Sequence, residues 1–126
     1  MKPIISEHFI RANRTRAERW HNGNLGNWSP AEWSNAIAGE VGELCNVTKK
    51  ILRLDEKMQQ RAVVHHVDET NRAEVRGNLL MHAAEELADV VTYCVVAAEA
   101  LGIDLNFALR HKFNAISERE GFPERV

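Results

Sequence analysis

The chain has 126 residues, with 16 lysines and arginines against 18 aspartates and glutamates. This length suits one domain with a modest core and is too short for two ordinary domains, so we predict a single domain over residues 1–126. The near balance of charge argues against partners such as duplex nucleic acid or an anionic membrane. It is compatible with a small anionic substrate.

Targeting segments and cysteine frameworks are not indicated. The first seven residues hold no apolar run long enough for a signal peptide, and no later segment approaches a charge-free membrane span. We therefore expect a cytoplasmic protein. Cys45 and Cys94 each lie in a helical pattern and not in a CxxC arrangement, which favours small core residues over a disulfide or a zinc site.

Helices are predicted from the start of the chain. Prolines stand at positions 3, 30 and 123 only, so residues 31–122 contain no obligatory helix breaker. A first helix is predicted over residues 3–20, and the Asn- and Gly-rich residues 21–27 favour turns.

The second helix has a well-defined start. Ser29 can cap it, Pro30 suits the first helical position, and Glu32 completes a capping box. Apolar residues then recur on one face at the helical period: Trp33, Ile37, Leu44, Val47 and Ile51. From Arg53 to Gly77 the pattern weakens, and either a loop with a short helix inside it or a helical extension fits this stretch.

Two further helices follow. Residues 78–101 predict a long helix that is apolar around much of its circumference, and Gly102 is its expected end. Asp104 can cap a last helix to about Arg119, whose inner face would consist of Leu105, Leu109, Phe113 and Ile116. Together these elements predict an all-α helical bundle of about four principal helices. One small bundle would struggle to cover the long apolar helix on every side, so we expect a homodimer or homotetramer that assembles through it.

Two pairs of acidic residues lean towards the predicted interior. Glu40 and Glu43 lie three residues apart, with Glu40 inside the apolar stripe of the second helix and Glu43 at its border. Glu86 and Asp89 repeat the spacing on the third helix. A single ExxE is usually a solvated helix face, but two pairs within apolar stripes favour a site.

Several carboxylates that face one interior repel one another and lose solvation unless a positive charge joins them. A single hard divalent cation can supply this positive charge to several carboxylates at once. Oxygen-only ligands favour Mg²⁺, with Mn²⁺ able to substitute, and magnesium commonly bridges to substrate phosphates.

These motifs resemble the MazG-like all-alpha nucleoside triphosphate pyrophosphohydrolases, a family that includes dimeric dUTPases and dCTP pyrophosphatases. The ExxE and ExxD pairs of that family correspond to Glu40, Glu43, Glu86 and Asp89, within Gly-Glu-Val-Gly-Glu-Leu and Glu-Glu-Leu-Ala-Asp-Val-Val. A less specific match is Lys-Phe-Asn at residues 112–114, followed by Gly-Phe-Pro at 121–123. The stretch from Arg53 to Gly77 is longer than the connection expected for the family.

The resemblance implies hydrolysis of a nucleoside triphosphate to the monophosphate and pyrophosphate, with magnesium held by the four acids. A carboxylate not fully committed to metal could take the proton of the attacking water, and we favour Glu43 for this role. Lys112 is the best candidate to bind phosphate oxygens, because it borders the inner stripe of its helix. Asn114 is added as a substrate contact on the resemblance.

Aromatic side chains could contact the base. Tyr93 lies one turn beyond Asp89, where relatives with pyrimidine substrates carry an aromatic residue, and Trp28 is also available. Trp33 is equally well explained as core. His82 does not form the ExxH pattern of di-iron proteins, and the His65–His66 pair is most simply a polar surface feature.

The competing interpretation is a non-catalytic helical interaction module. In that case the acids would form structural salt bridges with arginines across the bundle and would bind no metal.

Overall fold

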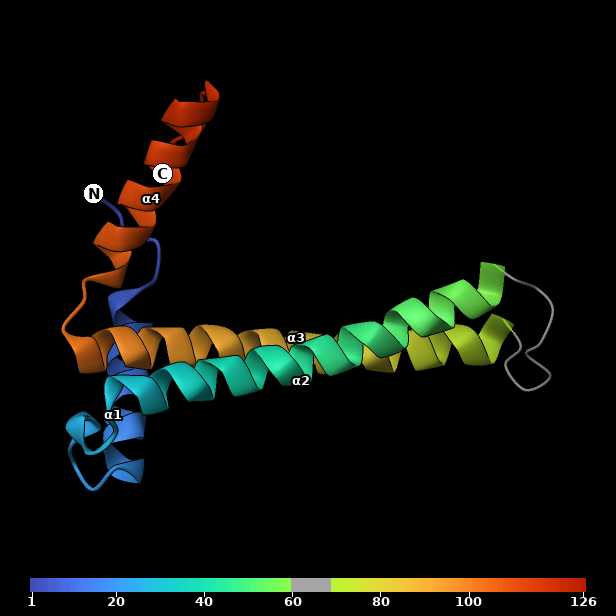
Figure 1. Ribbon diagram of the computed structural model, residues 1–126, viewed down its shortest axis with the longest axis horizontal. Helices are drawn as coiled ribbons and strands as arrows, with labels where there is room; N and C mark the ends of the chain where they lie inside the picture. Colours follow the sequence, from blue (N-terminus) through green and yellow to red (C-terminus); the bar gives the residue numbers. More distant parts are fainter. Residues whose placement is uncertain (60–68) are drawn as a thin grey trace. The chain divides into compact units, whose positions relative to one another are not determined.

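A computed structural model describes residues 1–59 and 69–126, and the regular structure in these ranges is helical throughout. The elements in chain order are α1 (Glu7–Trp20), the short 3-10 helix η1 (Leu25–Asn27), α2 (Pro30–Gln59), α3 (Glu69–Leu101) and α4 (Leu105–Glu120), as Figure 1 shows. The predicted all-α fold with four principal helices is therefore confirmed.

The helix starts follow from capping side chains. α1 begins at Glu7, later than predicted, because the Ser6 side chain caps it by accepting a hydrogen bond from the backbone N–H of Phe9 at 3.1 Å. At the start of α2 the predicted capping box is confirmed. The backbone N–H of Ser29 donates to the Glu32 carboxylate at 2.6 Å, and the Glu32 N–H donates to the Ser29 hydroxyl at 3.3 Å.

The ends of α3 and α4 are also as expected. Asp104 caps α4, because its carboxylate accepts the N–H of Phe107 at 2.9 Å. Gly102 and Gly121 follow the last residues of α3 and α4 with φ of 68° and 73°. Glycine adopts this left-handed conformation without the steric cost that a Cβ would add, so both positions end their helices.

The weakly patterned stretch from Arg53 to Gly77 extends the helices on both sides. α2 continues to Gln59 and α3 starts at Glu69, whereas the His65–His66 pair lies outside the described residues. Ion pairs link these two extensions. Asp55 accepts from Arg76 at 3.1 and 3.4 Å, and the Arg72 guanidinium lies 3.8 Å from the same carboxylate.

Contacts within the chain divide it into two compact units. The first unit comprises residues 1–34 and 92–126, and the second unit comprises residues 35–91. The helices α2 and α3 each run continuously through this division. The single domain over residues 1–126 stays a prediction.

The first unit contains most of the fully buried apolar side chains. They are Ala17 of α1, Leu25 of η1, Trp33 of α2, and Val95, Val96, Ala97 and Ala98 of α3. Polar contacts tie these elements together: the side-chain amide of Asn13 donates to the carbonyl of Thr92 at 2.9 Å, and the Trp33 indole N–H donates to the carbonyl of Leu25 at 3.3 Å. The core interpretation of Trp33 is thus confirmed.

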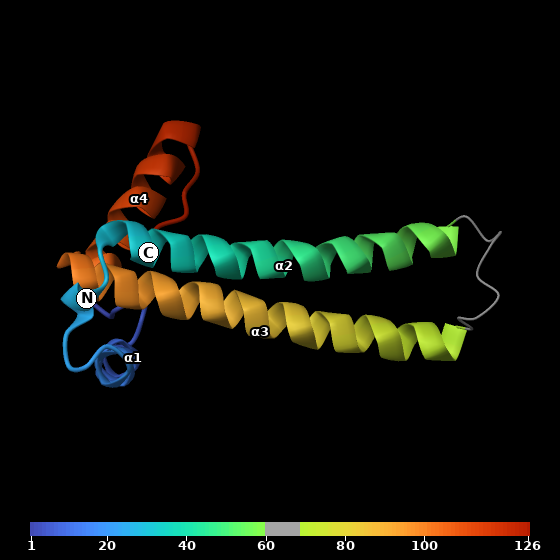
Figure 2. The same ribbon diagram turned by 60° about the horizontal axis from the view of Figure 1, so that its bottom comes forward.

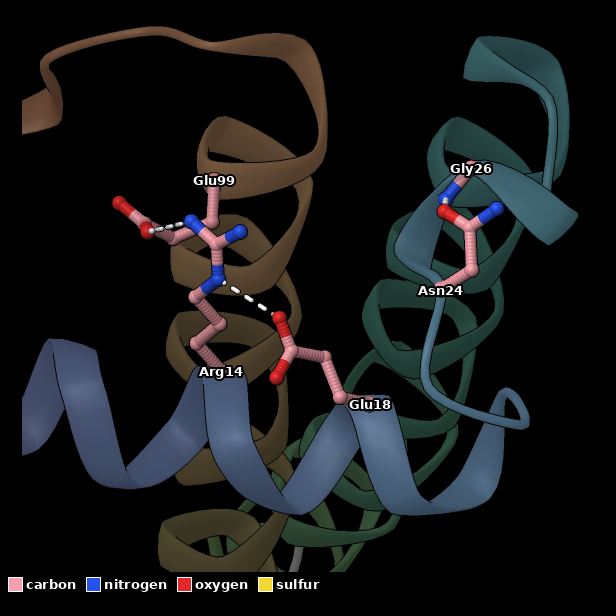
Figure 3. Close-up of polar contacts among 5 residues, drawn as sticks. All are labelled: Arg14, Glu18, Asn24, Gly26 and Glu99. Atoms are coloured by element: carbon pink, nitrogen blue, oxygen red, sulfur yellow. Dashed lines mark hydrogen bonds and ion pairs between the residues drawn. The ribbon is translucent and has the colours of Figure 1, made fainter.

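Three further hydrogen bonds shape the first unit, and Figure 3 shows them. The Arg14 guanidinium of α1 donates to Glu18 at 2.8 Å and to Glu99 of α3 at 3.2 Å, so it links the two helices. The Asn24 side chain accepts the N–H of Gly26 at 2.8 Å and thereby caps η1.

In the second unit, α2 and α3 run side by side in opposite directions, as both ribbon views show (Figure 1 and Figure 2). The predicted inner stripe of α2 is confirmed here: Val47 is buried, and Ile37, Leu44 and Ile51 are half-buried. Among the described side chains of this unit, the fully buried apolar residues are only Val47 and Ala83. The pair of helices therefore has little apolar core of its own.

Apolar residues lie around much of α3, as predicted, and several are exposed: Leu80, Met81, Leu87 and Val91. Within the described residues, no single helix is both long and apolar enough to cross a membrane. Residues Asn71–Leu101 of α3 and α4 are long and apolar enough only when they are taken together, and the two helices are bent by 111° at the break between them.

Two predictions of burial are wrong. The expected inner face of α4 is not buried, since Leu109 is 39% exposed, Phe113 45% and Ile116 38%. Cys45 is also exposed and not a core residue, since it lies on the side of α2 away from the stripe. Cys94 is half-buried, and burial raises the pKa of its thiol.

Candidate metal centre

Three of the four predicted metal ligands come together in the second unit. Glu40 and Glu43 project from α2, and Glu86 projects from α3. One carboxylate oxygen of each residue lies within 4.8 Å of the corresponding oxygens of the other two. We call these three residues the acid cluster. Helical spacing accounts for the pair on α2, and the antiparallel packing of the two helices brings the third acid to it.

The three acids differ in their access to water. Glu86 is only 8% exposed, Glu40 is half-buried, and Glu43 is exposed. A buried carboxylate loses much of its solvation, so Glu86 gains the most from a positive partner. The cluster thus has a buried inner end and an open outer end.

Electrostatic repulsion is visible at Glu40. Burial raises the pKa of the Glu40 carboxyl, and the negative charges of Glu43, Asp89 and Glu86 raise this pKa further. Each cause makes the ionised form of Glu40 less favourable in the metal-free protein. A bound cation would reverse the effect of the neighbouring charges.

Asp89, the fourth predicted ligand, is exposed and lies outside the acid cluster. Its charge nevertheless acts on Glu40. The structure therefore brings three predicted ligands together and leaves the fourth nearby. Glu86 lies on the inner side of α3, and Asp89 lies at the border of that side.

The sequence analysis overlooked one neighbour of the cluster. The Nε2 atom of His82 lies 2.9 Å from a carboxylate oxygen of Glu86. His82 precedes Glu86 by four residues on α3, so the two side chains share one face. The four-residue spacing is the sequence signal that identifies this pair.

The lysines and arginines that the structure describes do not neutralise the acid cluster. Among the described residues, no lysine or arginine nitrogen lies within 4.0 Å of a carboxylate oxygen of Glu40, Glu43 or Glu86. Elsewhere in the chain, acids such as Asp55 and Glu99 do pair with arginines. A set of close carboxylate oxygens that no described lysine or arginine contacts suits a hard divalent cation such as Mg²⁺ or Mn²⁺.

Comparisons with known proteins do not assign the chain to a family. No family model matches it. No curated protein and no solved structure is significantly similar to it either. The case for a function therefore depends on the acid cluster and on the motifs around it.

The predicted substrate contacts all belong to the first unit. Lys112 is exposed and Tyr93 is half-buried. The Asn114 amide is occupied by the last residue of the chain: the Val126 N–H donates to its oxygen at 3.0 Å, and its nitrogen donates to the Val126 carbonyl at 3.3 Å. Trp28 packs in an aromatic group, with its ring 4.6 Å from His21 and 4.7 Å from Trp33. Substrate binding by these residues stays a prediction.

Proposed function

We propose that the protein is a magnesium-dependent nucleoside triphosphate pyrophosphohydrolase similar to the MazG-like enzymes, and that it acts in cytoplasmic nucleotide-pool cleaning. The observation that carries this proposal is the acid cluster, in which two helices bring three carboxylates within 4.8 Å of one another. Its residues lie in the ExxE and ExxD motifs that resemble that family.

The arrangement supports hydrolysis of a phosphoanhydride. Mg²⁺, when bound, would neutralise phosphate oxygens and lower the cost of placing an anionic substrate beside carboxylates. Glu40, Glu43 and Glu86, whose carboxylate oxygens lie close together, would hold the cation, with Asp89 as the predicted fourth ligand. Glu43 is exposed, so a water molecule can reach its carboxylate.

In the proposed reaction, the oxygen of that water forms a bond to the α-phosphorus of the nucleoside triphosphate. The bridging bond breaks, and pyrophosphate leaves with the electron pair of that bond. Glu43 takes the proton of the water as general base. The products are a nucleoside monophosphate and pyrophosphate, so atoms and charge balance with water as the only other reactant.

The competing interpretation, an interaction module whose acids form salt bridges with arginines, fits the acid cluster less well. It requires a cationic side chain beside Glu40 or Glu43, and none lies there among the described residues. The contact of His82 with Glu86 aside, close carboxylates without a positive partner would destabilise such a module.

The test compares two neutralising variants on adjacent residues. Glu86→Gln removes the buried ligand, and Glu85→Gln makes the same change at an exposed neighbour outside the cluster. We expect Glu86→Gln to weaken Mn²⁺ binding more than about tenfold and to abolish pyrophosphate release, whereas Glu85→Gln retains both. Titration of Mn²⁺ by electron paramagnetic resonance reports binding, and circular dichroism checks that the helices persist.

A screen of the common triphosphates with magnesium, assayed for pyrophosphate against orthophosphate, tests the reaction class. The proposal fails if millimolar Mg²⁺ with a nucleotide mixture changes neither the thermal stability nor the tryptophan fluorescence of the protein. Full turnover by Glu86→Gln would remove that residue from the site.

We also expect the enzyme to be a homodimer or homotetramer. The second unit buries few apolar side chains, and α3 exposes Leu80, Leu87 and Val91. Further helices from a partner subunit would cover such residues and complete a bundle.

A further inference from the structure

One side of α4, together with the segment that follows it, lines a cleft of about 380 Å³. Phe107, Arg110 and Asn114 of this side recur three or four residues apart, as neighbours on one helix face do. Arg125 lines the cleft from the segment after α4, which the Asn114 amide holds through two hydrogen bonds to the backbone of Val126 at 3.0 and 3.3 Å. The volume lies within the range of pockets that bind small molecules, about 300–1,000 Å³.

Two arginines line the cleft without a carboxylate partner. Among the described residues, no carboxylate oxygen lies within 4.0 Å of a guanidinium nitrogen of Arg110 or Arg125. Arg14 and Arg76, by contrast, each pair with an acid. Of the described residues that line the cleft, only Glu118 is acidic, and it lies two turns of α4, about 12 Å, from Arg110. The cleft therefore carries an excess of positive charge.

Backbone carbonyls hold both guanidinium groups in place. Arg110 donates to the carbonyl of Lys2 at 2.8 Å. The Nη1 atom of Arg125 donates to the carbonyls of Phe122 and Glu124 at 2.7 and 2.8 Å. A guanidinium has more N–H donors than these carbonyls use, so each arginine keeps donors for a ligand. Donors that are fixed before a ligand arrives bind it at a lower entropic cost.

An aromatic pair lines the same cleft. The rings of Phe107 and His111 stack, with their centroids 5.8 Å apart and an angle of 20° between their planes. Phe107 is 65% exposed, so much of its ring is open to contact. A flat ring on a ligand would pack against such an aromatic side chain.

We propose that this cleft binds a small phosphate monoester that carries an aromatic group. Arg110 and Arg125 would bind the phosphate oxygens, and Phe107 would contact the aromatic group. Two cations favour a phosphate monoester, which carries nearly two negative charges at about pH 7, over a carboxylate, which carries one.

This site shares no residue with the acid cluster, and the predicted substrate contact Lys112 does not line it. All of its residues belong to the first unit. The inference therefore would stand even if the acid cluster bound no metal.

The test is calorimetric titration of the full chain with phenyl phosphate. EDTA keeps metal from the acid cluster, and constant ionic strength keeps the screening of charge equal. We expect saturable binding that Arg125→Gln weakens more than about fivefold. Arg119→Gln is the matched control and should bind like the native protein, because Arg119 is an exposed arginine of α4 that pairs with Glu120 and does not line the cleft.

A second variant covers the case in which Arg125→Gln loses its helical circular dichroism. Phe107→Ala should weaken the binding of phenyl phosphate and leave that of inorganic phosphate unchanged, since only phenyl phosphate has a ring. Benzoate should bind the native protein more than about fivefold more weakly than phenyl phosphate does.

A native protein without saturable binding of phenyl phosphate overturns the inference. So does an equal loss of affinity in Arg125→Gln and Arg119→Gln, because it would indicate a diffuse effect of charge. Affinity for phenyl phosphate that Phe107→Ala leaves unchanged, or benzoate that binds as tightly as phenyl phosphate, contradicts the proposed ligand class.

Discussion

At the scale of single residues, the proposed function gives chemically equal carboxylates different tasks according to their burial. Glu86 is nearly excluded from water, whereas Glu43 is open to it. A buried anion needs a partner and suits a ligand, while an exposed anion stays in contact with water and suits a proton acceptor. The spacing of Glu40 and Glu43 could not reveal this division, because it depends on what the facing helix covers.

Lys112 provides a residue-scale prediction for the substrate side. We expect Lys112→Ala to raise KM or lower kcat for the preferred triphosphate, because a cation at the phosphate chain is lost, while the affinity for Mn²⁺ is retained. Steady-state kinetics with parallel metal titration measures both. Lys50→Ala, at another exposed lysine, is the control. An unchanged rate at subsaturating nucleotide would place Lys112 among ordinary surface residues.

Asp55 provides a prediction of pH dependence. The hydrogen bond from Arg76 lowers the pKa of the Asp55 carboxyl below its ordinary value of 3.8, and the charges of Arg76 and Arg72 act in the same direction. A folded pKa below the unfolded one stabilises the protein above the unfolded pKa, and this contribution is lost as pH falls through the folded pKa.

We therefore expect Asp55→Asn to be less stable than the native protein at about pH 7 and to approach it near about pH 3. Urea unfolding at both pH values measures the difference. Glu56→Gln is the neighbouring control at an exposed position. A difference that is the same at both pH values would contradict the role of this ion pair.

At the scale of elements, short-range chemistry accounts for where the helices begin and end. Ser6, Ser29 and Asp104 cap α1, α2 and α4, and glycines follow α3 and α4. Each of these signals acts within a few residues, so the sequence alone predicted most of them. The continuation of α2 to Gln59 was open beforehand, because contacts of Asp55 with α3 support it.

The capping box of α2 is directly testable. Ser29→Ala removes the hydroxyl that accepts the N–H of Glu32, and we expect a loss of about 1 kcal/mol in the free energy of unfolding. Ser34→Ala is the matched control, since the Ser34 hydroxyl only donates back to the carbonyl of Pro30 at 3.0 Å within the helix. Denaturant unfolding should show little change for the control. Equal losses for both variants would contradict the capping role.

At the scale of the whole molecule, the two compact units share two continuous helices. Fully buried apolar residues are concentrated in the first unit, and the second unit has Val47 and Ala83 among its described side chains. Because α2 and α3 pass through both units, unfolding of one unit removes helical support from the other. We therefore expect one cooperative transition.

Two matched substitutions test this coupling. Val47 in the second unit and Val95 in the first are each 2% exposed. Truncation of either to Ala should cost about 2 kcal/mol and should shift the same transition. Circular dichroism and tryptophan fluorescence should report coincident unfolding, since the three tryptophans belong to the first unit. Separate transitions, with Val47→Ala affecting only one, would show that the units unfold independently.

The sequence by itself determined the all-α class, the order of the four helices, most of their caps and the inner stripe of α2, because these depend on periodicity and on neighbours a few residues away. It also placed Glu40 and Glu43 on one side of a helix. Only the tertiary structure decided that Glu86 joins them, that Asp89 stands apart and that His82 contacts Glu86. It likewise decided that Leu109, Phe113 and Ile116 of α4 stay partly exposed. Helical periodicity shows which residues share a face, whereas the packing of distant segments decides what that face meets.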